Sequence, residues 1–288
     1  MIDLHAHTTA SDGSFTPTEL VQLALSLGLT ALAVTDHDTI DGVPEAVEAA
    51  AMTGTLEVVP GIEFSVDYIH GEFHLLGYFV DVAQPAFLSR VRYLQENRFN
   101  RNQVMVRLMQ EQGFEITLAD VEAEAGGGQI GRPHMARAMM RKGYVQSVQE
   151  AFNEYLADGK PLHVPKVKLD PAEAIELVHA AGGVAVLAHP RFLGFSARDE
   201  LFTELTRLRA LGLDGLECYY SQHSSEQTET YLGMAAELDL VVTSGSDFHG
   251  VSKPDVPLGV VFQGKPGAPE LLERLRARRN ERQIVVAP

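Results

Sequence analysis

Ile2-Asp3-Leu4-His5-Ala6-His7 stands at the start of the chain, and Asp12 follows five residues after His7. Side chains alternate between the two faces of a strand, so His5 and His7 at the end of a short apolar strand point to the same side. Two imidazoles placed in this way can hold one metal ion. An isolated pair is more often just two histidines near a chain end, so the meaning of this stretch depends on the rest of the chain.

Length and composition fit one large globular core, since the chain has 288 residues, of which 45% are apolar and 22% charged. No apolar run is long enough to span a bilayer, and the start lacks the features of a signal peptide. We therefore expect a cytoplasmic protein without a membrane partner. The single cysteine, Cys218, fits a reducing compartment and is expected to pack in the core.

The charge balance is strongly acidic, with a formal net charge of −16 from 39 acidic and 23 basic side chains. This balance argues against binding to duplex nucleic acid, whose phosphates attract basic proteins. A small anionic substrate stays compatible with it, because bound divalent cations can reverse the sign of the potential inside an acidic pocket. The sequence carries no signal for the number of subunits.

Short apolar strands alternate with helices along most of the chain. The first helix should begin after Thr16, where Thr16, Pro17 and Glu19 form a capping box with proline at the first helical position, and should end before Gly28. Alternation of this kind predicts a parallel sheet covered by helices, either a barrel or a doubly wound sheet. Strands are expected at 31–35, 56–61, 72–80, 184–188, 215–218, 240–243 and 260–262, and further helices at 43–52, 171–182, 200–211, 225–238 and 270–278.

The pattern changes between residues 88 and 160. Longer helical segments rich in Arg, Gln, Glu and Met surround a glycine run at 126–128. We interpret residues 88–160 as a mostly helical insertion, which divides the repeating core into a first part, 1–87, and a second part, 161–288.

Candidate metal ligands recur after successive strands. In a barrel, functional groups gather at the carboxyl ends of the strands, so these residues are expected to meet there. A mixed set of imidazoles and carboxylates suits Mn, Fe or Zn, and so many donors exceed what one ion takes, which predicts two or three divalent metal ions. Such ions favour hydrolysis of a phosphate ester, with hydrolysis of a cyclic amide as the competitor. The candidates are His5, His7, Asp12, His37, Glu63, His74, His189, Asp247 and His249.

Five motifs carry a family resemblance: IDLHAHTTASDGSFTPTEL from Ile2, TDHDT, PGIEFS, AHP and SGSDFHG, which ends at Gly250. Together they resemble the polymerase and histidinol phosphatase (PHP) family, in particular its small stand-alone bacterial phosphoesterases. The resemblance implies an α/β fold, a distorted seven-stranded (β/α) barrel, with a trinuclear metal centre and an insertion that covers it. The amidohydrolase superfamily also begins with His-x-His, but it usually adds a bridging lysine after a mid-barrel strand, which this chain lacks.

The resemblance also implies roles for the ligands. Glu63 would bridge two ions, and hydroxide held between ions would attack phosphorus. The substrates implied are small phosphorylated molecules: nucleotides such as nucleoside 3′,5′-bisphosphates, or the ends of short RNA. Histidinol phosphate is an alternative substrate, and a non-catalytic accessory or binding module is the alternative from another class. One ion would take His5, His7, Glu63 and Asp247, another Asp12, His37 and His249, and the third Glu63, His74 and His189. The residues expected to act most directly in catalysis are Asp12, His37, Glu63 and His249.

Substrate binding needs donors outside the metal ligands. Arg132 and His134 stand at the expected start of a helix, a natural phosphate site, within a segment that resembles the substrate-binding segment of the family; a solvated arginine and a capping histidine are the plainer alternative. His223 and Arg191 follow strands on the same side and are further candidates. Asp36 and Asp38 are expected to orient ligands. Basic side chains expected to be merely solvated are Arg98, Arg101, Lys160 and Lys166.

Overall fold

Seven short strands pair in chain order and curl until the first and the last lie side by side. The computed structural model describes residues 1–286. The main chain joins the two edge strands, since the N–H of His7 donates to the carbonyl of Phe248 and that of Asp247 to the carbonyl of His5, both at 2.9 Å. The predicted seven-stranded α/β barrel is thereby confirmed. The strands are β1 (Ile2–Ala6), β2 (Ala31–Val34), β3 (Glu57–Val66), β4 (Phe73–Tyr78), β5 (Val184–Leu187), β6 (Gly215–Tyr220) and β7 (Val241–Gly245).

The direction of β4 corrects the expectation of a wholly parallel sheet. β4 runs antiparallel to both β3 and β5, while the other neighbouring strands are parallel. Residues 67–72, which join β3 to β4, are too few for a parallel crossover, which takes a dozen residues or more. The reversal brings the beginning of β4 to the edge of the barrel where the other strands end.

β3 is also longer than the expected strand 56–61. Pro60 does not end it, because it pairs with Val34 within the parallel ladder, and the strand continues to Val66. Gly61 allows this close approach, since a side-chain carbon there would lie 2.9 Å from the carbonyl oxygen of Val34. Glu63 therefore lies inside a strand and not in a loop beyond it, which holds its side chain rigidly.

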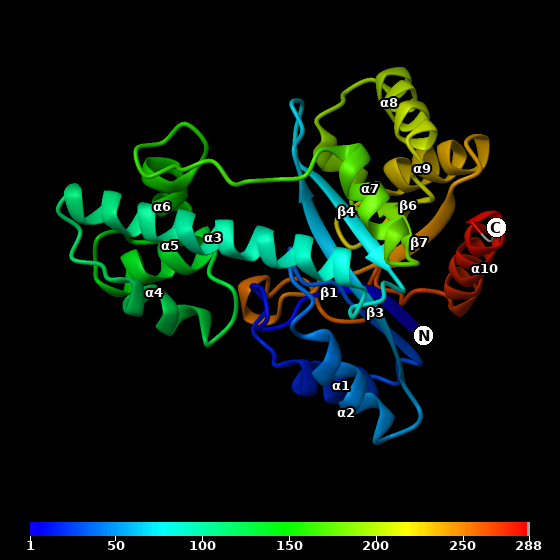
Figure 1. Cartoon of the computed structure of the whole chain (residues 1–288), viewed down its shortest axis with the longest axis horizontal. Helices are drawn as coiled ribbons and strands as arrows, with labels where there is room; N and C mark the ends of the chain where they lie inside the picture. The colour runs from blue at the N-terminus through cyan, green and yellow to red at the C-terminus, as the bar shows by residue number, and fades with distance from the viewer. Residues whose placement is uncertain (287–288) are drawn as a thin grey trace.

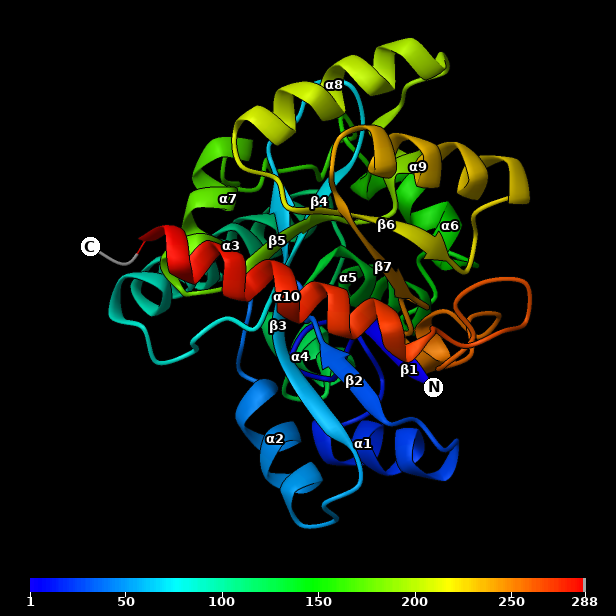
Figure 2. The ribbon, with the colours of Figure 1, turned by 90° about the vertical axis from the view of Figure 1, so that its right-hand side faces the viewer.

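Helices cover the outside of the barrel, and Figure 2 shows the last of them crossing one end. The capping box of the first helix is confirmed, with the Thr16 and Glu19 side chains each bonded to the other's backbone N–H. Residues 260–262 form no strand, only an isolated bridge between Phe262 and Lys265. The helices are α1 (Pro17–Ser26), α2 (Val43–Ala51), α7 (Pro171–Ala180), α8 (Arg198–Ala210), α9 (Ser225–Glu237) and α10 (Pro269–Val286), with 3-10 turns η2 (Pro190–Leu193) and η3 (Gly250–Ser252).

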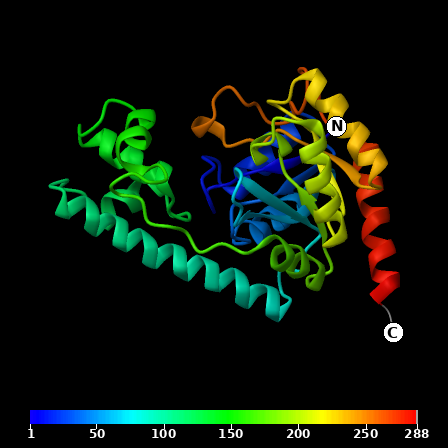
Figure 3. The ribbon, with the colours of Figure 1, turned by 90° about the horizontal axis from the view of Figure 1, so that it is seen from above.

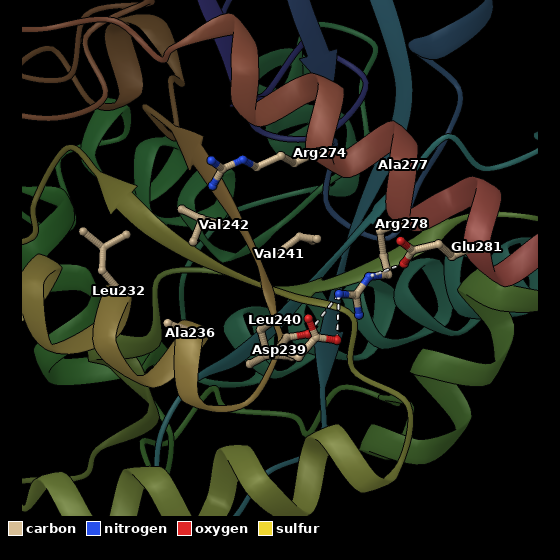
Figure 4. A pocket seen from close by; sticks show the side chains of 10 residues that line it. All are labelled: Leu232, Ala236, Asp239, Leu240, Val241, Val242, Arg274, Ala277, Arg278 and Glu281. Carbon is tan, nitrogen blue, oxygen red and sulfur yellow. Dashed lines mark hydrogen bonds and ion pairs between the residues drawn. The ribbon is translucent and has the colours of Figure 1, made fainter.

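α10 covers the end of the barrel where the parallel strands begin. It is longer than the expected helix 270–278, and its Leu271, Leu272 and Leu275 pack against Ile2 of β1 and Tyr78 of β4. A shallow groove separates α10 from α9 and the start of β7, and the Arg278–Asp239 ion pair lies in its wall (Figure 4). This end lies opposite the edge at which the candidate ligands follow the strands.

The remaining helices extend away from the barrel (Figures 1 and 3). They pack around a separate cluster of buried apolar side chains that includes Met105, Val121 and Met135. The long α3 connects this cluster to the barrel, and none of the helices within residues 1–286 is long and apolar enough to cross a membrane. The helices are α3 (Pro85–Glu111), α4 (Leu118–Ala125), α5 (Arg132–Arg141) and α6 (Val148–Ala151), followed by the π-helical turn η1 (Phe152–Leu156).

Candidate metal centre

The carboxylate of Glu63 lies at the centre of a group of imidazoles. Its Oε2 atom is 3.3 Å from Nε2 of His5, 3.2 Å from Nε2 of His7 and 3.0 Å from Nδ1 of His37. β1 supplies His5 and places His7 just beyond its end, with both side chains on one face as the alternation predicts. An isolated bridge between the backbones of His37 and Glu63 holds the third imidazole in place.

The second oxygen of Glu63 contacts two further imidazoles. Oε1 lies 3.0 Å from Nδ1 of His74 and 3.1 Å from Nε2 of His189. His74 stands near the beginning of β4, and only the antiparallel direction of that strand puts it at this edge of the barrel. His189 follows β5 with a φ of +24°, an uncommon conformation for a residue other than glycine.

Asp12, Asp247 and His249 complete the group on the other side of His7. Nε2 of His7 lies 3.2 Å from Oδ1 of Asp247, and Nε2 of His249 lies 3.3 Å from Oδ1 of Asp12. Gly245 allows the approach of β1 to β7, because a side-chain carbon there would lie 2.1 Å from Cβ of His5. All nine residues predicted as ligands thus lie together at one edge of the barrel.

Three subsets of these donors lie close enough together to hold an ion, with all donor atoms of a subset within 4.8 Å of one another. The first subset is the one that the resemblance implies. Compared with the ligand sets that the resemblance implies, the second subset contains His7 in addition, and the third contains His37 in place of His189. The subsets are His5, His7, Glu63 and Asp247; His7, Asp12, His37 and His249; and His37, Glu63 and His74.

The donor atoms themselves fit metal ions. Buried nitrogen and oxygen atoms normally have hydrogen-bond partners, and a group without them needs an explanation. Here buried atoms without a hydrogen bond face one another, and their chemistry of imidazole nitrogen and carboxylate oxygen is that of Mn, Fe or Zn ligands. Divalent cations between them would satisfy the whole group. The atoms include Nε2 of His5 and His7, Nδ1 of His37 and His74, Oε2 of Glu63 and Oδ1 of Asp12.

The charges in this buried group shift the pKa values of its members. Burial opposes ionisation of Glu63, but the neighbouring imidazoles, His37 and His5 foremost, outweigh it and hold the pKa of this carboxyl well below its ordinary range. Burial likewise lowers the pKa of His7, whereas the carboxylates of Asp247 and Glu63, each 3.2 Å from its Nε2, overcome this and raise it to about 9. The carboxylates are therefore ionised at neutral pH, as metal ligands must be.

Three side chains that the sequence analysis missed hold the ligands in place. Glu217 of β6 is fully buried; its Oε1 lies 3.0 Å from Nδ1 of His5, and its Oε2 accepts from the backbone N–H of His189 at 2.8 Å. Lys253 and Tyr220 both donate to Oδ2 of Asp247, at 2.6 and 2.9 Å. A glutamate inside an apolar strand was a signal that could have identified Glu217, whereas no local feature of the sequence indicated a role for Lys253.

Asp36 and Asp38, which were expected to orient ligands, contact other groups. Asp36 accepts from the backbone and hydroxyl of Thr8 and from the hydroxyl of Ser11, so it shapes the loop that carries Asp12. Asp38 binds Arg98 at 2.6 Å. Neither aspartate bonds a ligand imidazole directly: Asp36 acts on the loop between His7 and Asp12, and the carboxylate that contacts the imidazole of His5 is Glu217.

Arg132 and His134 begin α5, as the sequence predicts. Arg132 donates to Oδ1 of Asp158 at 2.6 Å and to the carbonyl of Leu156, so its guanidinium is paired within the helical segment. His134 is buried, and its Nδ1 accepts from the backbone N–H of Gly131 at 2.9 Å, which assigns the ring proton to Nε2. Burial, and then the charge of Arg137, lower the pKa of His134 to about 4.

His223 and Arg191 follow β6 and β5. His223 is buried and not on the surface, with Nδ1 3.0 Å from the carbonyl oxygen of Cys218, and burial lowers its pKa to about 4. Arg191 donates to the carbonyl of Gln222 and has no acidic partner within the described chain. Neither side chain forms a hydrogen bond or ion pair with the nine candidate ligands within residues 1–286, and a role in substrate binding stays a prediction for both. Cys218 is buried in the core, as expected.

Two basic residues expected to be solvated are instead held at the barrel. Arg98 and Lys166 have side chains that are only 11% and 18% exposed, and both bind Oδ2 of Asp38. Lys166 also donates to the hydroxyl of Ser65 at 2.8 Å. Lys160 is exposed, in agreement with its prediction.

The fold and the donor group define the class of the protein: an α/β barrel with histidines and carboxylates suited to divalent ions, gathered at the edge where its parallel strands end. Residues 3–159, more than half of the chain, match the PHP domain. The chain belongs to the PHP family.

Its relatives in this family include the 5′-3′ exoribonuclease Rnm of Escherichia coli, which is 33% identical over 86% of this chain and 84% of its own. The 3′,5′-nucleoside bisphosphate phosphatase of Chromobacterium violaceum is 32% identical over 86% of this chain and 87% of its own. A solved structure of a proposed metal-dependent phosphoesterase of Bifidobacterium adolescentis matches 96% of both chains with 34% identity and a TM-score of 0.83.

Proposed function

We propose that this protein hydrolyses phosphate esters of nucleotides, either nucleoside 3′,5′-bisphosphates or the phosphorylated ends of short RNA. The chain is an enzyme of the phosphoric ester hydrolase class, like the relatives it matches over most of its length. The observation that carries the proposal is the meeting of eight other imidazoles and carboxylates around Glu63, far apart in sequence and with buried donor atoms that lack hydrogen bonds.

Metal ions would be held in three positions. We assign His5, His7, Glu63 and Asp247 to one, Asp12, His37 and His249 to another, and His74 and His189 with Glu63 to the third. Divalent ions held there would polarise phosphoryl oxygens and acidify water, which is the chemistry that hydrolysis of a phosphate ester requires.

His134 would supply a hydrogen bond to the substrate. Its ring proton lies on Nε2, since Nδ1 accepts from the N–H of Gly131, and its pKa of about 4 keeps the ring neutral at physiological pH. The negative charge of Asp12 raises the pKa of this ring but does not offset burial. A neutral N–H donor suits a phosphoryl or leaving oxygen, and it would keep this role unchanged from pH 5 upward.

The helical segment 88–160 would form a separate insertion domain that covers the substrate. Gly128 lies against the barrel loop that precedes Asp12, because a side-chain carbon there would fall 1.5 Å from the carbonyl oxygen of Thr9. The N–H of Gln129 donates to the carbonyl of Ala10 at 3.0 Å. These contacts support a position of the segment over the ligands.

A panel of substrates tests the proposal. The protein is loaded with Mn²⁺ and kcat/KM is measured for a nucleoside 3′,5′-bisphosphate, a 5′-phosphorylated RNA oligonucleotide, histidinol phosphate and a cyclic amide. We expect the nucleotides to give the highest values. His7→Asn should abolish turnover, while His70→Asn, the same exchange at an exposed histidine, should leave it intact.

Each alternative has its own result. Preference for histidinol phosphate would change the substrate, and turnover of the cyclic amide alone would favour an amidohydrolase. No turnover of any substrate with metals restored would favour a non-catalytic binding module. Turnover that survives complete chelation would rule out the metal-dependent mechanism.

A further inference from the structure

β1 and the end of β7 meet where the barrel closes, and Figure 2 shows the two strands at neighbouring positions. We call residues 2–7 and 245–249 the closure seam. The distances between the candidate ligands on its two sides depend on how the closure seam is held together. These ligands are His5 and His7 on one side and Asp247 and His249 on the other.

The pairing of β1 with β2 is irregular within the closure seam. Its register shifts between Asp3 and Ala6, and His5, which lies between them, has no partner in the ladder. An irregularity of this kind redirects side chains and leaves backbone groups that need other partners. The N–H of His5 donates to Oδ1 of Asp3 at 3.2 Å. The side chain of Asp3 thus replaces a strand partner for the backbone of a candidate ligand.

The carboxylate of Asp3 also joins β1 to two distant segments. Its Oδ1 accepts from the backbone N–H of Ser246, the residue before Asp247, at 3.0 Å. Its Oδ2 accepts from the N–H of Gly259 at 2.8 Å. Asp3 is fully buried, so the loss of any of these bonds would leave an N–H group unsatisfied in the protein interior. One buried carboxylate therefore connects both sides of the closure seam.

Asp247 depends on these contacts because its backbone has an uncommon conformation. Its φ is +61°, in the left-handed region that few residues other than glycine adopt. Its own N–H donates to the carbonyl of His5 at 2.9 Å, and the preceding N–H is bonded to Asp3. Lys253 then holds the side chain through Oδ2, at 2.6 Å. Asp3 thus acts on the backbone of this candidate ligand and Lys253 on its carboxylate.

We infer that Asp3 is a positioning residue of the metal centre, whose carboxylate holds the ligands on the two sides of the closure seam in one arrangement. This inference rests on the proposed function, since it concerns the ions that the proposed function assigns to these ligands. Two of the three assigned positions use ligands of the closure seam. The third, which Glu63, His74 and His189 would form, uses none. Loss of the Asp3 carboxylate should therefore weaken the binding of two ions and spare the third.

Asp3→Asn tests the inference, because an amide has one oxygen and cannot accept hydrogen bonds at both former oxygen positions. The full chain is freed of metal by chelation and titrated with Mn²⁺, and electron paramagnetic resonance of the free ion gives the number and affinity of the bound ions. Changes to groups that orient ligands lower metal affinity about 10–100-fold, and we expect this loss for two of the three ions. Asp214→Asn is the matched control. Asp214 is also fully buried and accepts from a backbone N–H, that of Ala185 at 3.0 Å, but it lies where the parallel strands begin, so all Mn²⁺ affinities should stay unchanged.

Amide hydrogen exchange gives a second measurement, which does not depend on the folding of a variant. In the unaltered protein, the N–H groups of His5 and Ser246 should be protected from exchange as strongly as those in the ladder between β2 and β3, because a buried carboxylate accepts from both. In Asp3→Asn, the loss of a bond to a charged acceptor should speed the exchange of at least one N–H group that bonds to Asp3 about tenfold. Asp214→Asn should leave this exchange unchanged.

The outcomes separate the inference from the proposed function. Weaker binding of two Mn²⁺ ions by Asp3→Asn than by Asp214→Asn supports the inference. Equal affinities in the two folded variants would overturn it, and so would an equal loss for all three ions, which would show that the charge of Asp3 acts and not the closure seam. If Asp3→Asn does not fold, exchange in the unaltered protein decides, and rapid exchange at His5 and Ser246 overturns the inference. An unaltered protein that binds no Mn²⁺ would refute the proposed metal centre, and the inference with it.

Discussion

Glu217→Gln is the most informative single change, because it keeps the shape of a side chain that orients two candidate ligands. Oε1 of Glu217 lies 3.0 Å from Nδ1 of His5, and Oε2 accepts from the N–H of His189 at 2.8 Å, in a fully buried position. Glutamine has one oxygen and one NH2 group, so it can accept only one of these two hydrogen bonds. Its NH2 group must then face the donor that has lost its acceptor.

The expected size of the effect follows from these contacts. A hydrogen bond to a charged group contributes about 1.5–3 kcal/mol, and one such bond is lost together with the charge that fixes the tautomer of His5. Changes to groups that orient ligands lower metal affinity or activity about 10–100-fold, which agrees with that range. We expect Mn²⁺ affinity to fall by this factor and kcat/KM at limiting Mn²⁺ to fall with it.

Metal content measured over a series of chelator-buffered Mn²⁺ concentrations, with kcat/KM for a phosphomonoester recorded in parallel, checks this prediction. Glu229→Gln on α9 is the matched control, since it makes the same change at an exposed position. A far-ultraviolet circular dichroism spectrum confirms that each variant is folded. If folded Glu217→Gln binds Mn²⁺ as tightly as the control, Glu217 does not position these ligands and our reasoning is wrong.

Three further predictions concern stability. Gly245→Ala should lower the melting temperature, because the added carbon would lie 2.1 Å from Cβ of His5. The control Gly233→Ala, whose added carbon would have no atom within 4 Å, should stabilise α9 by about 0.5–1 kcal/mol. If calorimetry ranks the two variants in the opposite order, the close approach of β1 and β7 is contradicted. Chelation should lower the melting temperature and added Mn²⁺ restore it, because the buried carboxylates then lack cations; an unchanged transition would argue against a metal-linked fold. Burial, and then Arg98, lower the pKa of Lys166 to about 7 from 10.5, so the unfolded chain binds more protons in that window and stability should rise with pH across it. Urea unfolding at about pH 7 and pH 9 should show a smaller rise for Lys166→Gln, and equal rises would refute this pKa.

Local signals in the sequence predict much of the fold and the site. The capping box at Thr16 is a local feature, and so is the alternation that puts His5 and His7 on one face of β1. Residues that follow strands converge because a barrel brings all its strand ends to one edge. That rule alone placed His37, His189 and Asp247 near one another without any knowledge of loop geometry.

The departures have tertiary causes. A proline usually ends a strand, yet Pro60 pairs with Val34 and β3 continues beyond it. Because the expected strand was shorter than β3, the link from β3 to β4 appeared longer than it is. The direction of β4 followed from that link. Glu217 looked like an odd residue in an apolar strand because its partner, His5, is 212 positions away. Arg98 and Lys166 resembled solvated charges, since a buried Asp38 that attracts both cannot be seen in the sequence around either.

The acidity of the whole chain and the positive charge of divalent ions held at the candidate ligands would act over different distances. Charges on a protein surface are screened beyond about 8 Å at physiological ionic strength, so the net charge of −16 governs the approach of long polyanions more than the binding of a small one. A short nucleotide bound at the candidate ligands would lie within that distance of the divalent ions that these residues would hold. A long RNA would keep most of its phosphates over the acidic surface. Activity should therefore fall as the oligonucleotide lengthens, and the fall should diminish as salt rises; a rate independent of length would show that the net charge plays no part in selecting the substrate.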